Sequence, residues 1–365
     1  MIATIEAPRE SLPVAAWQPV SPRVIRQTGP YRHTFGPDVA PMARVAPGET
    51  VIIHTQDCFQ GRLCREDQAP SVVLGAQRLN PLTGPIWIEG AEPGDTLVVH
   101  IDDLQPARDW AVSCLLRQCG GLTASEEAPT LQPQLPERVW IYHRTQGGGF
   151  AWRDRWEVPW APFFGTIGTA PALETLSCLS LGAHGGNLDV PEIGPGRTLF
   201  LPVQAPGALF SVGDAHAAQG QGELSGPALE IEAYGTFRFG LVKDQALTRP
   251  RLESAATIMT VGTGRPMEEA ARTAYFDLVA WMATDFGFDP LDAYQLLTQV
   301  GRLHVGNMVN ATYSLVASCA KRYLPAGGGV GHHWPDAVPA LAPTPPPTLQ
   351  YRAPLPPGER PWYMT

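Results

Sequence analysis

Positive charge is scarce in this sequence, where lysine occurs only as Lys243 and Lys321 among 365 residues and the net charge is -9. Nucleic acids and anionic membranes bind to a cationic face of a protein, so neither is an expected partner. No apolar run is long enough to cross a membrane, and the N-terminal segment lacks the basic and then apolar order of a secretory signal. We therefore expect a cytoplasmic protein.

Several structural and catalytic motifs are also missing. The six cysteines show no CxxC spacing, so they indicate neither a zinc ribbon nor a disulfide framework. The sequence has no G-x-S-x-G elbow and no Gly/Ser-rich run of the kind found in Ser-Ser-Lys amidases. A thiol amidase would need an activating lysine beside its nucleophile, and Cys58, with Glu89 or Glu92 as the base, stays open as an alternative.

Glycine and proline are abundant, with 37 and 38 residues, and they separate short apolar runs. The predicted strands are 51–55, 86–89, 97–101, 198–203 and 208–212, with a further pair within 229–243. The turn sequences around 90–95 and 204–207 predict β-hairpin-like units. Because these β units follow one another without helices between them, we expect a sandwich or a barrel.

Two helices are predicted near the C-terminus. Residues 266–287 begin with a proline and acidic residues and end at a glycine, and residues 289–301 begin with an Asp-Pro pair. We expect both helices to pack on a sheet, and the chain then to return to β structure. The proline-rich tail, 325–365, cannot form regular structure, so we expect it to wrap the surface or to reach a neighbouring subunit of a homo-oligomer.

Three clusters of polar residues interrupt the β pattern near the ends of predicted strands. They are His54 and Asp57; His184, Asn187 and Asp189; and Asp214, His216, Gln219 and Glu223. Alternation along an extended strand places Asp214 and His216 on one face, where they could bind one ion. Zinc accepts mixed imidazole and carboxylate ligands and activates water for attack on a carbonyl. Polar turns that bond to their own backbone are the alternative.

Six segments, in this order, resemble the acetamidase/formamidase family: DCFQG, NPLTGPIWIEGAEPGDTL, GTIGTAP, HGGNLDV, LFLPV and GALFSVGDAHAAQGQGE. The resemblance covers about 51–324. It implies a mainly β fold with α/β elements, made of a jelly-roll-like β-sandwich, a smaller β-barrel and a two-helix segment near the C-terminus. It also implies hydrolysis of the C–N bond of simple amides to carboxylate and ammonia with a divalent metal.

The polar residues of the three clusters match positions of the family motifs, and their individual roles are our inference from side-chain chemistry. The expected catalytic residues are Glu223 and Asp57, the expected metal ligands are His184, Asp189, His216 and Asp57, and the expected substrate contacts are Asn187, Gln219, Asp214 and His54. Glu223 is the expected general base that takes a proton from water. The expected cofactor is a divalent metal, zinc, and the expected partner is a small-molecule amide.

The sequence departs from the family pattern at Ala215, where glycine is usual, and at 308–311, where MVNA replaces VVDP. We therefore expect a pocket unlike that of a formamide enzyme, lined by 108–116 and 162–168 and able to accept an aryl amide. A non-catalytic jelly-roll binding protein is the alternative of a different class, although a binding module has no need of water-activating carboxylates.

The sequence pattern and the family resemblance together predict four parts of the chain. They are an N-terminal extension (1–45), a β-rich catalytic core (46–264), a helical and strand segment that completes the fold (265–324) and the C-terminal tail (325–365).

Overall fold

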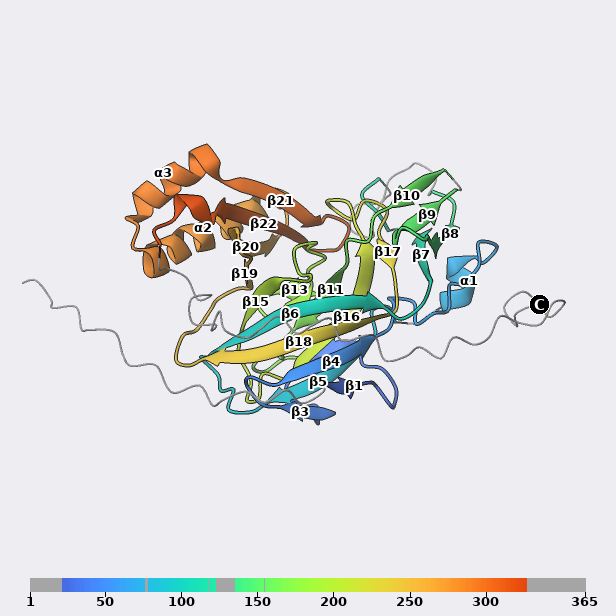
Figure 1. Ribbon diagram of the computed structural model, residues 1–365, viewed down its shortest axis with the longest axis horizontal. Helices are drawn as coiled ribbons and strands as arrows, with labels where there is room; N and C mark the ends of the chain where they lie inside the picture. The colour runs from blue at the N-terminus through green and yellow to red at the C-terminus, as the bar shows by residue number, and fades with distance from the viewer. Residues whose placement is uncertain (1–21, 76–77, 118, 123–134, 154, 327–365) are drawn as a thin grey trace, which may run out of the picture.

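The strands form two large sheets that share one core in the computed structural model (Figure 1). The structure describes residues 22–75, 78–117, 119–122, 135–153 and 155–326. One sheet has nine strands, in the spatial order β1 (Arg23–Ile25), β4 (Thr50–Thr55), β18 (Ala233–Val242), β6 (Thr96–Pro106), β15 (Arg197–Pro202), β19 (Arg251–Glu253), β20 (Thr257–Gly264), β22 (Tyr313–Ala320) and β21 (Arg302–Asn307).

The other large sheet has eleven strands. Nine of them follow the order β10 (Trp156–Val158), β9 (Phe150–Trp152), β8 (Arg138–Arg144), β7 (Trp110–Leu115), β17 (Leu229–Glu230), β16 (Phe210–Ala218), β11 (Phe163–Gly168), β14 (Gly185–Asn187) and β13 (Leu181–Gly182), while β5 (Leu82–Ile88) pairs with β16 and β3 (Ala43–Val45) pairs with β5. The remaining described elements are the pair β2 (Thr34–Phe35) and β12 (Leu176–Ser177), the helices α1 (Pro70–Leu74), α2 (Met267–Phe286) and α3 (Pro290–Val300), and the 3-10 turn η1 (Lys321–Tyr323).

The predicted strands are present, but the predicted hairpin-like units are wrong. β5 pairs with β16 and β3, whereas the next strand, β6, pairs with β18 and β15 in the opposite sheet. β15 and β16 are also split between the two sheets, and so are β17 and β18. The Pro-Gly turns after β5 and β15 therefore lead the chain from one sheet to the other instead of reversing it within one ladder.

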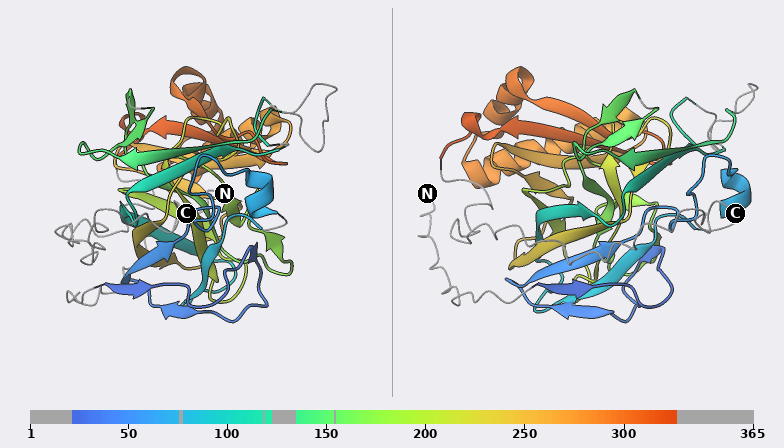
Figure 2. Two further views of the ribbon diagram at one scale, coloured as in Figure 1. Left: turned by 90° about the vertical axis from the view of Figure 1, so that its right-hand side faces the viewer. Right: turned by 45° about the vertical axis from the view of Figure 1, so that its right-hand side comes forward.

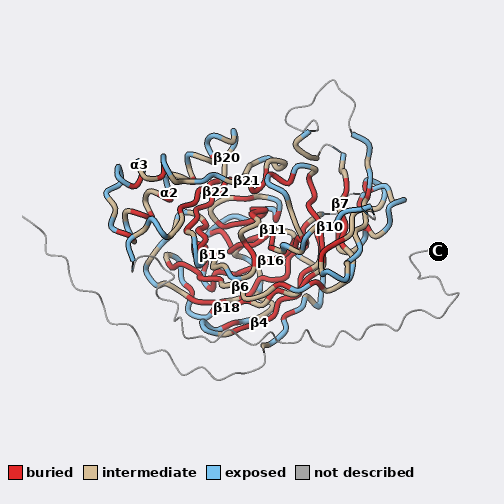
Figure 3. The backbone as a smooth tube through the Cα atoms, turned by 45° about the horizontal axis from the view of Figure 1, so that its top comes forward, coloured by how far each residue is buried: buried red, intermediate tan, exposed pale blue. Residues whose placement is uncertain are grey.

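The main hydrophobic core lies between the two sheets. Val99 and Phe237 enter it from β6 and β18, and Phe210 enters from β16, with the rings of Phe210 and Phe237 6.0 Å apart. Figure 3 shows buried backbone concentrated along these central strands. The fold is mainly β, as predicted. Within the described residues the sheets end at open edges, β1 and β21 in one and β10 and β13 in the other, so the expected small barrel is not found, and the jelly-roll connectivity stays a prediction.

α2 and α3 cover β20 and β22 at one end of the nine-stranded sheet (Figures 1 and 2). Leu278 and Trp281 of α2 pack with Phe200 of β15, Ile258 of β20 and Ala317 of β22. The two predicted helices and their packing on a sheet are confirmed, and the chain returns to this sheet as β21 and β22.

Local sequence sets the ends of these helices. Glu268 and Glu269 lie in the first turn of α2, where negative charge is favourable, and Gly287 ends the helix with a left-handed φ of 70°. The Asp289 side chain caps α3 by accepting hydrogen bonds from the backbone amides of Leu291 and Asp292. The capping signals seen in the sequence therefore act as expected.

The ends of the chain are described only in part. β1 and β3 join the large sheets through β4 and β5, and the tail from residue 327 onward lies outside the described residues, as do residues 1–21. The four-part division of the chain stays a prediction. Among the described helices, none has both the length and the apolar character needed to span a membrane.

A buried ion pair joins α2 to β19 and generates a stability prediction. Arg251 donates two hydrogen bonds to Asp277, at 3.0 and 2.8 Å, and the two side chains are 11% and 6% exposed. We expect Asp277→Ala to lower the free energy of unfolding by about 3 kcal/mol, because Arg251 stays buried without its counter-ion. Urea unfolding measures the change. The exposed Asp292 provides the control Asp292→Ala, and a loss no larger than the control's would contradict the expectation.

Candidate active site

Buried acidic, imidazole and thiol groups gather around β16. Two groups of possible metal-ligating atoms, each with its atoms within 4.8 Å of one another, are Asp189, His216 and Glu223, and Cys58, Asp214 and Glu230. β16 supplies Asp214 and His216, and the neighbouring strand β17 supplies Glu230. Side chains from distant parts of the sequence therefore meet at one centre.

His216 of the first group also faces Asp214 and Glu230 of the second group, and Gln219 fixes the orientation of its ring. The amide nitrogen of Gln219 donates to two backbone carbonyls, both at 2.9 Å, so its oxygen must be the atom that faces His216 Nδ1 at 3.0 Å. Nδ1 therefore carries a proton and donates it to this oxygen. The other ring nitrogen, Nε2, lies 3.3 Å from an oxygen of Glu230 and 3.4 Å from an oxygen of Asp214.

Amide side chains hold the carboxylates in place. Asn80 Nδ2 donates to Asn187 Oδ1 and to Asp214 Oδ2, both at 2.7 Å. Asn187 Nδ2 donates to Asp189 Oδ2 at 2.7 Å, and Asn307 Nδ2 donates to the same oxygen at 2.5 Å. Each carboxylate keeps one oxygen that these amides do not bind.

Four residues of the site have a left-handed backbone conformation, which is uncommon for residues other than glycine. Asn80, Asp189, Asp214 and Glu223 have φ values of 52, 48, 57 and 51°. Such conformations concentrate at functional sites. Asp214 and His216 both belong to β16 and their side chains meet, although the backbone of Asp214 is left-handed rather than extended.

Gly165 of β11 lies directly against the site. A Cβ atom at this position would lie 2.5 Å from Asp189 Oδ1 and 2.7 Å from Asp214 Oδ2. Both distances are shorter than any that real Cβ atoms adopt. Any side chain here would displace the two carboxylates, so the site requires glycine at this position.

Burial and mutual repulsion favour the protonated forms of the acids. Burial, followed by the charge of Asp214, raises the pKa of Asp189 to about 7. Burial and the neighbouring carboxylates raise the pKa values of Glu223 and Glu230 well above the usual range. Burial lowers the pKa of His216, but the nearby carboxylates outweigh it and raise that pKa to about 10. In the metal-free centre protons therefore balance acids that outnumber the one imidazole, and a bound cation would take the place of those protons.

A divalent cation fits this centre. Asp189 Oδ1, His216 Nε2 and Glu230 Oε2 are buried and make no hydrogen bond within the described part of the chain. Carboxylate, imidazole and thiol groups are all ligands that zinc accepts. The residues present thus supply both the donor atoms and the charge that such an ion needs.

A small cavity of about 110 Å³ opens onto the centre. Its lining includes Cys58, Asn80, Asp214, Glu223 and Glu230. A water molecule occupies about 30 Å³ in the liquid, so the cavity holds a group of only a few non-hydrogen atoms. A primary amide group is of this size.

Asp57 and His184, both predicted as metal ligands, lie in neither group of ligating atoms. Asp57 accepts hydrogen bonds from backbone amides of its own turn, and its Oδ2 lies 2.6 Å from Arg108 Nη1. His184 packs against Phe35, with ring centroids 5.2 Å apart, and burial lowers its pKa to about 4. His184 Nε2 is buried without a hydrogen-bond partner among the described residues, and the ligand roles of both residues stay predictions.

The four predicted substrate contacts divide into two pairs. Asn187 and Asp214 line the small cavity. Gln219 instead uses its amide to orient His216, and the Nε2 atom of His54 lies 2.6 Å from a Glu232 oxygen, outside the lining of the small cavity.

Three residues of the site were not predicted from the sequence, namely Glu230, Asn80 and Asn307. Glu230 is 1% exposed between the buried Leu229 and Ile231, so an acidic residue inside an apolar strand pattern was the available signal. Asn80 opens the segment NPLTGPIWIEGAEPGDTL, which resembles the family, so that segment was the available signal. Asn307 carries no such signal, because it reaches the site only through long-range folding.

The two departures from the family pattern, at Ala215 and at 308–311, lie at different distances from the small cavity. Asn310, within MVNA, lines the small cavity, whereas Ala215 is buried in the main core. The expected wall segment 108–116 contributes Leu116 to this cavity, and 162–168 contributes nothing to it.

The family model described as the Acetamidase/Formamidase family matches residues 20–180 and 172–326. The chain therefore belongs to this family, whose named members are amide-hydrolysing enzymes.

Individual relatives agree with this assignment. The structure of an acetamidase from Yersinia enterocolitica is 38% identical, covers 83% of this chain and 94% of that chain, and has a TM-score of 0.81. A formamidase from Methylophilus methylotrophus is 24% identical over 82% of this chain and 89% of its own length. The match to a protein of Schizosaccharomyces pombe named as a formamidase is 28% identical and spans 52% of this chain and 58% of that protein.

The raised pKa of Asp189 generates a prediction for the metal-free protein. Its folded value of about 7 exceeds the ordinary 3.8, so the folded state holds this proton more tightly than the unfolded state. The resulting stabilisation is present at low pH and is lost as the pH rises from 3.8 to about 7. With a chelator present, urea unfolding should therefore show Asp189→Asn gaining stability relative to the wild type over this range. A difference that does not change with pH would contradict this account.

Proposed function

We propose that this protein is a metal-dependent amidohydrolase that cleaves the C–N bond of a primary amide to give a carboxylate and ammonia. The observation that carries the proposal is the buried group of Asp189, His216 and Glu223, of which Glu223 lines a cavity of about 110 Å³. Membership of a family of amide-hydrolysing enzymes supports the reaction class. The cavity size supports a primary amide as the reacting group.

Asp189 and His216 would hold the ion, which we propose to be zinc, and Asp214 and Glu230, with oxygens 3.4 and 3.3 Å from His216 Nε2, would be further donors. A bound divalent ion supplies a Lewis acid for the amide carbonyl and lowers the pKa of water. The proton on His216 Nδ1, fixed by Gln219, leaves Nε2 as the nitrogen that faces the centre.

Glu223 is the proposed proton acceptor, as predicted. It lies in the wall of the small cavity and is 7% exposed, and its Oε1 accepts a hydrogen bond from the Ala228 amide at 3.1 Å. The carboxylate takes a proton from the attacking water and gives it to the departing nitrogen, which leaves as ammonia. The pKa of Glu223 is raised in the metal-free centre, and the positive charge of a bound divalent ion would lower it, so that the carboxylate form is available to accept the proton.

The geometry gives less support to the two alternatives, a thiol amidase that uses Cys58 and a binding protein without catalysis. A thiol amidase would need a thiolate at Cys58, but burial and the charges of Glu230 and Asp214 raise the pKa of this thiol well above its usual value. A binding protein without catalysis would gain nothing from several acids that repel one another in a buried site, because such groups cost folding free energy.

We also propose that the enzyme forms a homo-oligomer. Phe276 of α2 is 78% exposed, and Leu291 and Tyr294 of α3 are 76% and 64% exposed. Large apolar side chains that are exposed on the helices of one layer support association through that layer.

Glu223→Gln tests the proton transfer. Glutamine has nearly the same shape but cannot accept a proton, so we expect kcat for acetamide to fall by about two to four orders of magnitude. Elemental analysis should still find the divalent ion in the variant, and ammonia release measures the rate. Glu192→Gln, which alters a carboxylate paired with His304, is the control and should leave kcat unchanged. Loss of the metal from Glu223→Gln would identify Glu223 as a ligand instead.

Cys58→Ala separates the metal mechanism from the thiol mechanism. At saturating zinc we expect the variant to keep more than about a tenth of the wild-type kcat, because the thiol does not attack the substrate. A variant that has lost all turnover while its circular dichroism spectrum is unchanged would support a nucleophilic Cys58.

A further inference from the structure

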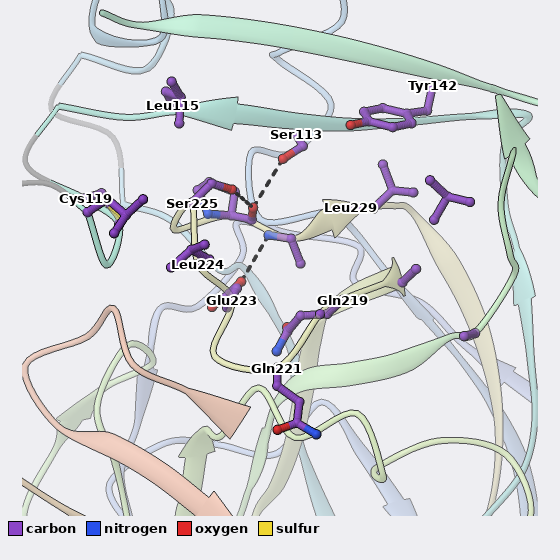
Figure 4. Close-up of a pocket in the computed structure, with 18 of the residues that line it drawn as sticks. Ser113, Leu115, Cys119, Tyr142, Gln219, Gln221, Glu223, Leu224, Ser225 and Leu229 are labelled. Atoms are coloured by element: carbon purple, nitrogen blue, oxygen red, sulfur yellow. Dashed lines mark hydrogen bonds between the residues drawn. The ribbon is translucent and has the colours of Figure 1, made fainter. Parts of the chain in front are cut away.

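A second and larger cavity, whose lining residues are drawn in Figure 4, shares part of its wall with the small one. Its volume is about 720 Å³, and it shares Cys119, Glu223 and Pro227 with the small cavity. Sites for small molecules have volumes of about 300–1,000 Å³. The larger cavity therefore has the size of a ligand site, and Glu223 forms part of both walls.

Apolar side chains form most of the larger cavity's lining. Leu115 comes from β7, Val158 from β10 and Leu229 from β17, and Figure 4 shows Leu115 and Leu229 as parts of the same lining. The hydroxyls of Ser113 and Ser225 both donate to the Pro227 carbonyl, at 3.2 and 3.1 Å. Two of the polar groups in this wall are thus already bonded within the protein, which leaves a surface suited to an apolar ligand.

The charge of the wall restricts the ligand further. Of the described residues that line the larger cavity, Glu223 is the single one with an ionisable carboxylate, and none carries a basic side chain. A ligand with its own carboxylate would find no counter-ion there and would face Glu223. The ligand portion in this cavity must therefore be uncharged as well as apolar.

We propose that the larger cavity binds the acyl substituent of the substrate, and that the preferred substrates are primary amides of aromatic or cyclic carboxylic acids. This inference rests on the proposed amide hydrolysis. The small cavity takes the amide group, because its wall carries the polar centre, and the ammonia that leaves fits within it. The substituent on the carbonyl carbon then extends past Cys119 and Pro227 into the larger cavity.

The volume of the two cavities favours a larger substrate over formamide or acetamide. Either of those molecules would fill the small cavity and leave about 720 Å³ of apolar space unused. A ring buried against Leu115 and Leu229 removes apolar surface from water, which raises kcat/KM by about tenfold or more when the contact persists in the transition state.

The test compares benzamide with acetamide in the full-length enzyme and in Leu115→Trp, which narrows the larger cavity. We expect the wild type to have a kcat/KM for benzamide at least about tenfold above that for acetamide. Leu115→Trp should lower the benzamide value by about tenfold or more and change the acetamide value by less than about threefold. The matched control is Leu173→Trp at a position 93% exposed and outside both cavities, which should change neither value.

Calorimetric titration with benzamide separates this inference from the proposed reaction. Weaker benzamide binding in Leu115→Trp but not in Leu173→Trp, with no ammonia released from either amide, would support the cavity assignment and refute the hydrolysis. Benzamide binding and turnover that are equal in Leu115→Trp and the wild type would overturn the assignment. A preference for acetanilide over benzamide would also overturn it, because the cavity would then hold the substituent on nitrogen.

Circular dichroism would reveal a misfolded Leu115→Trp protein. A second variant therefore tests the same cavity independently. Ala161→Phe introduces a ring at an exposed position in the lining of the larger cavity. It should also lower benzamide binding and turnover relative to acetamide, and equal values for the variant and the wild type would overturn the assignment.

Discussion

The surplus of buried negative charge around His216 is the constraint on which the rest of the structure depends. Asp189, Asp214, Glu223 and Glu230 are each no more than 7% exposed, and one imidazole faces them. An ion buried without a partner costs several kcal/mol, so protons or a cation must balance these charges. This imbalance lowers the stability of the metal-free chain, and it would favour the binding of the divalent ion that we propose.

Both sheets hold this centre together against its own repulsion. β16 lies between β11 and β17 and also pairs with β5, which fixes Asp214 and His216 inside the eleven-stranded sheet. β21 belongs to the other sheet, yet its residue Asn307 donates to Asp189, and the neighbouring Gly306 carbonyl accepts from Gln219. The helical layer that packs on β20 and β22 therefore supports the site indirectly, through the strand beside β22.

The sequence predicted the elements better than their arrangement. Apolar periodicity and capping residues such as Asp289 act locally, so the strands and both helices could be predicted. A Pro-Gly turn has the same sequence whether it reverses a strand or leads the chain to another sheet. The sequence therefore could not show that the predicted hairpin-like units cross between the sheets. In the site, the motif segments held Asp189, His216 and Glu223. Asn307 lies 118 residues from its partner Asp189, and only the complete fold shows that the two meet.

Anomalous diffraction from zinc-soaked crystals, recorded on both sides of the zinc absorption edge, tests the central claim most directly. The account predicts a strong peak in contact with His216 Nε2 and carboxylate oxygens of the cluster, Asp189 Oδ1 among them. A peak bound instead by His184 or Asp57, or no peak near His216 in crystals of active enzyme, would contradict the claim that this surplus of charge exists to hold a metal ion.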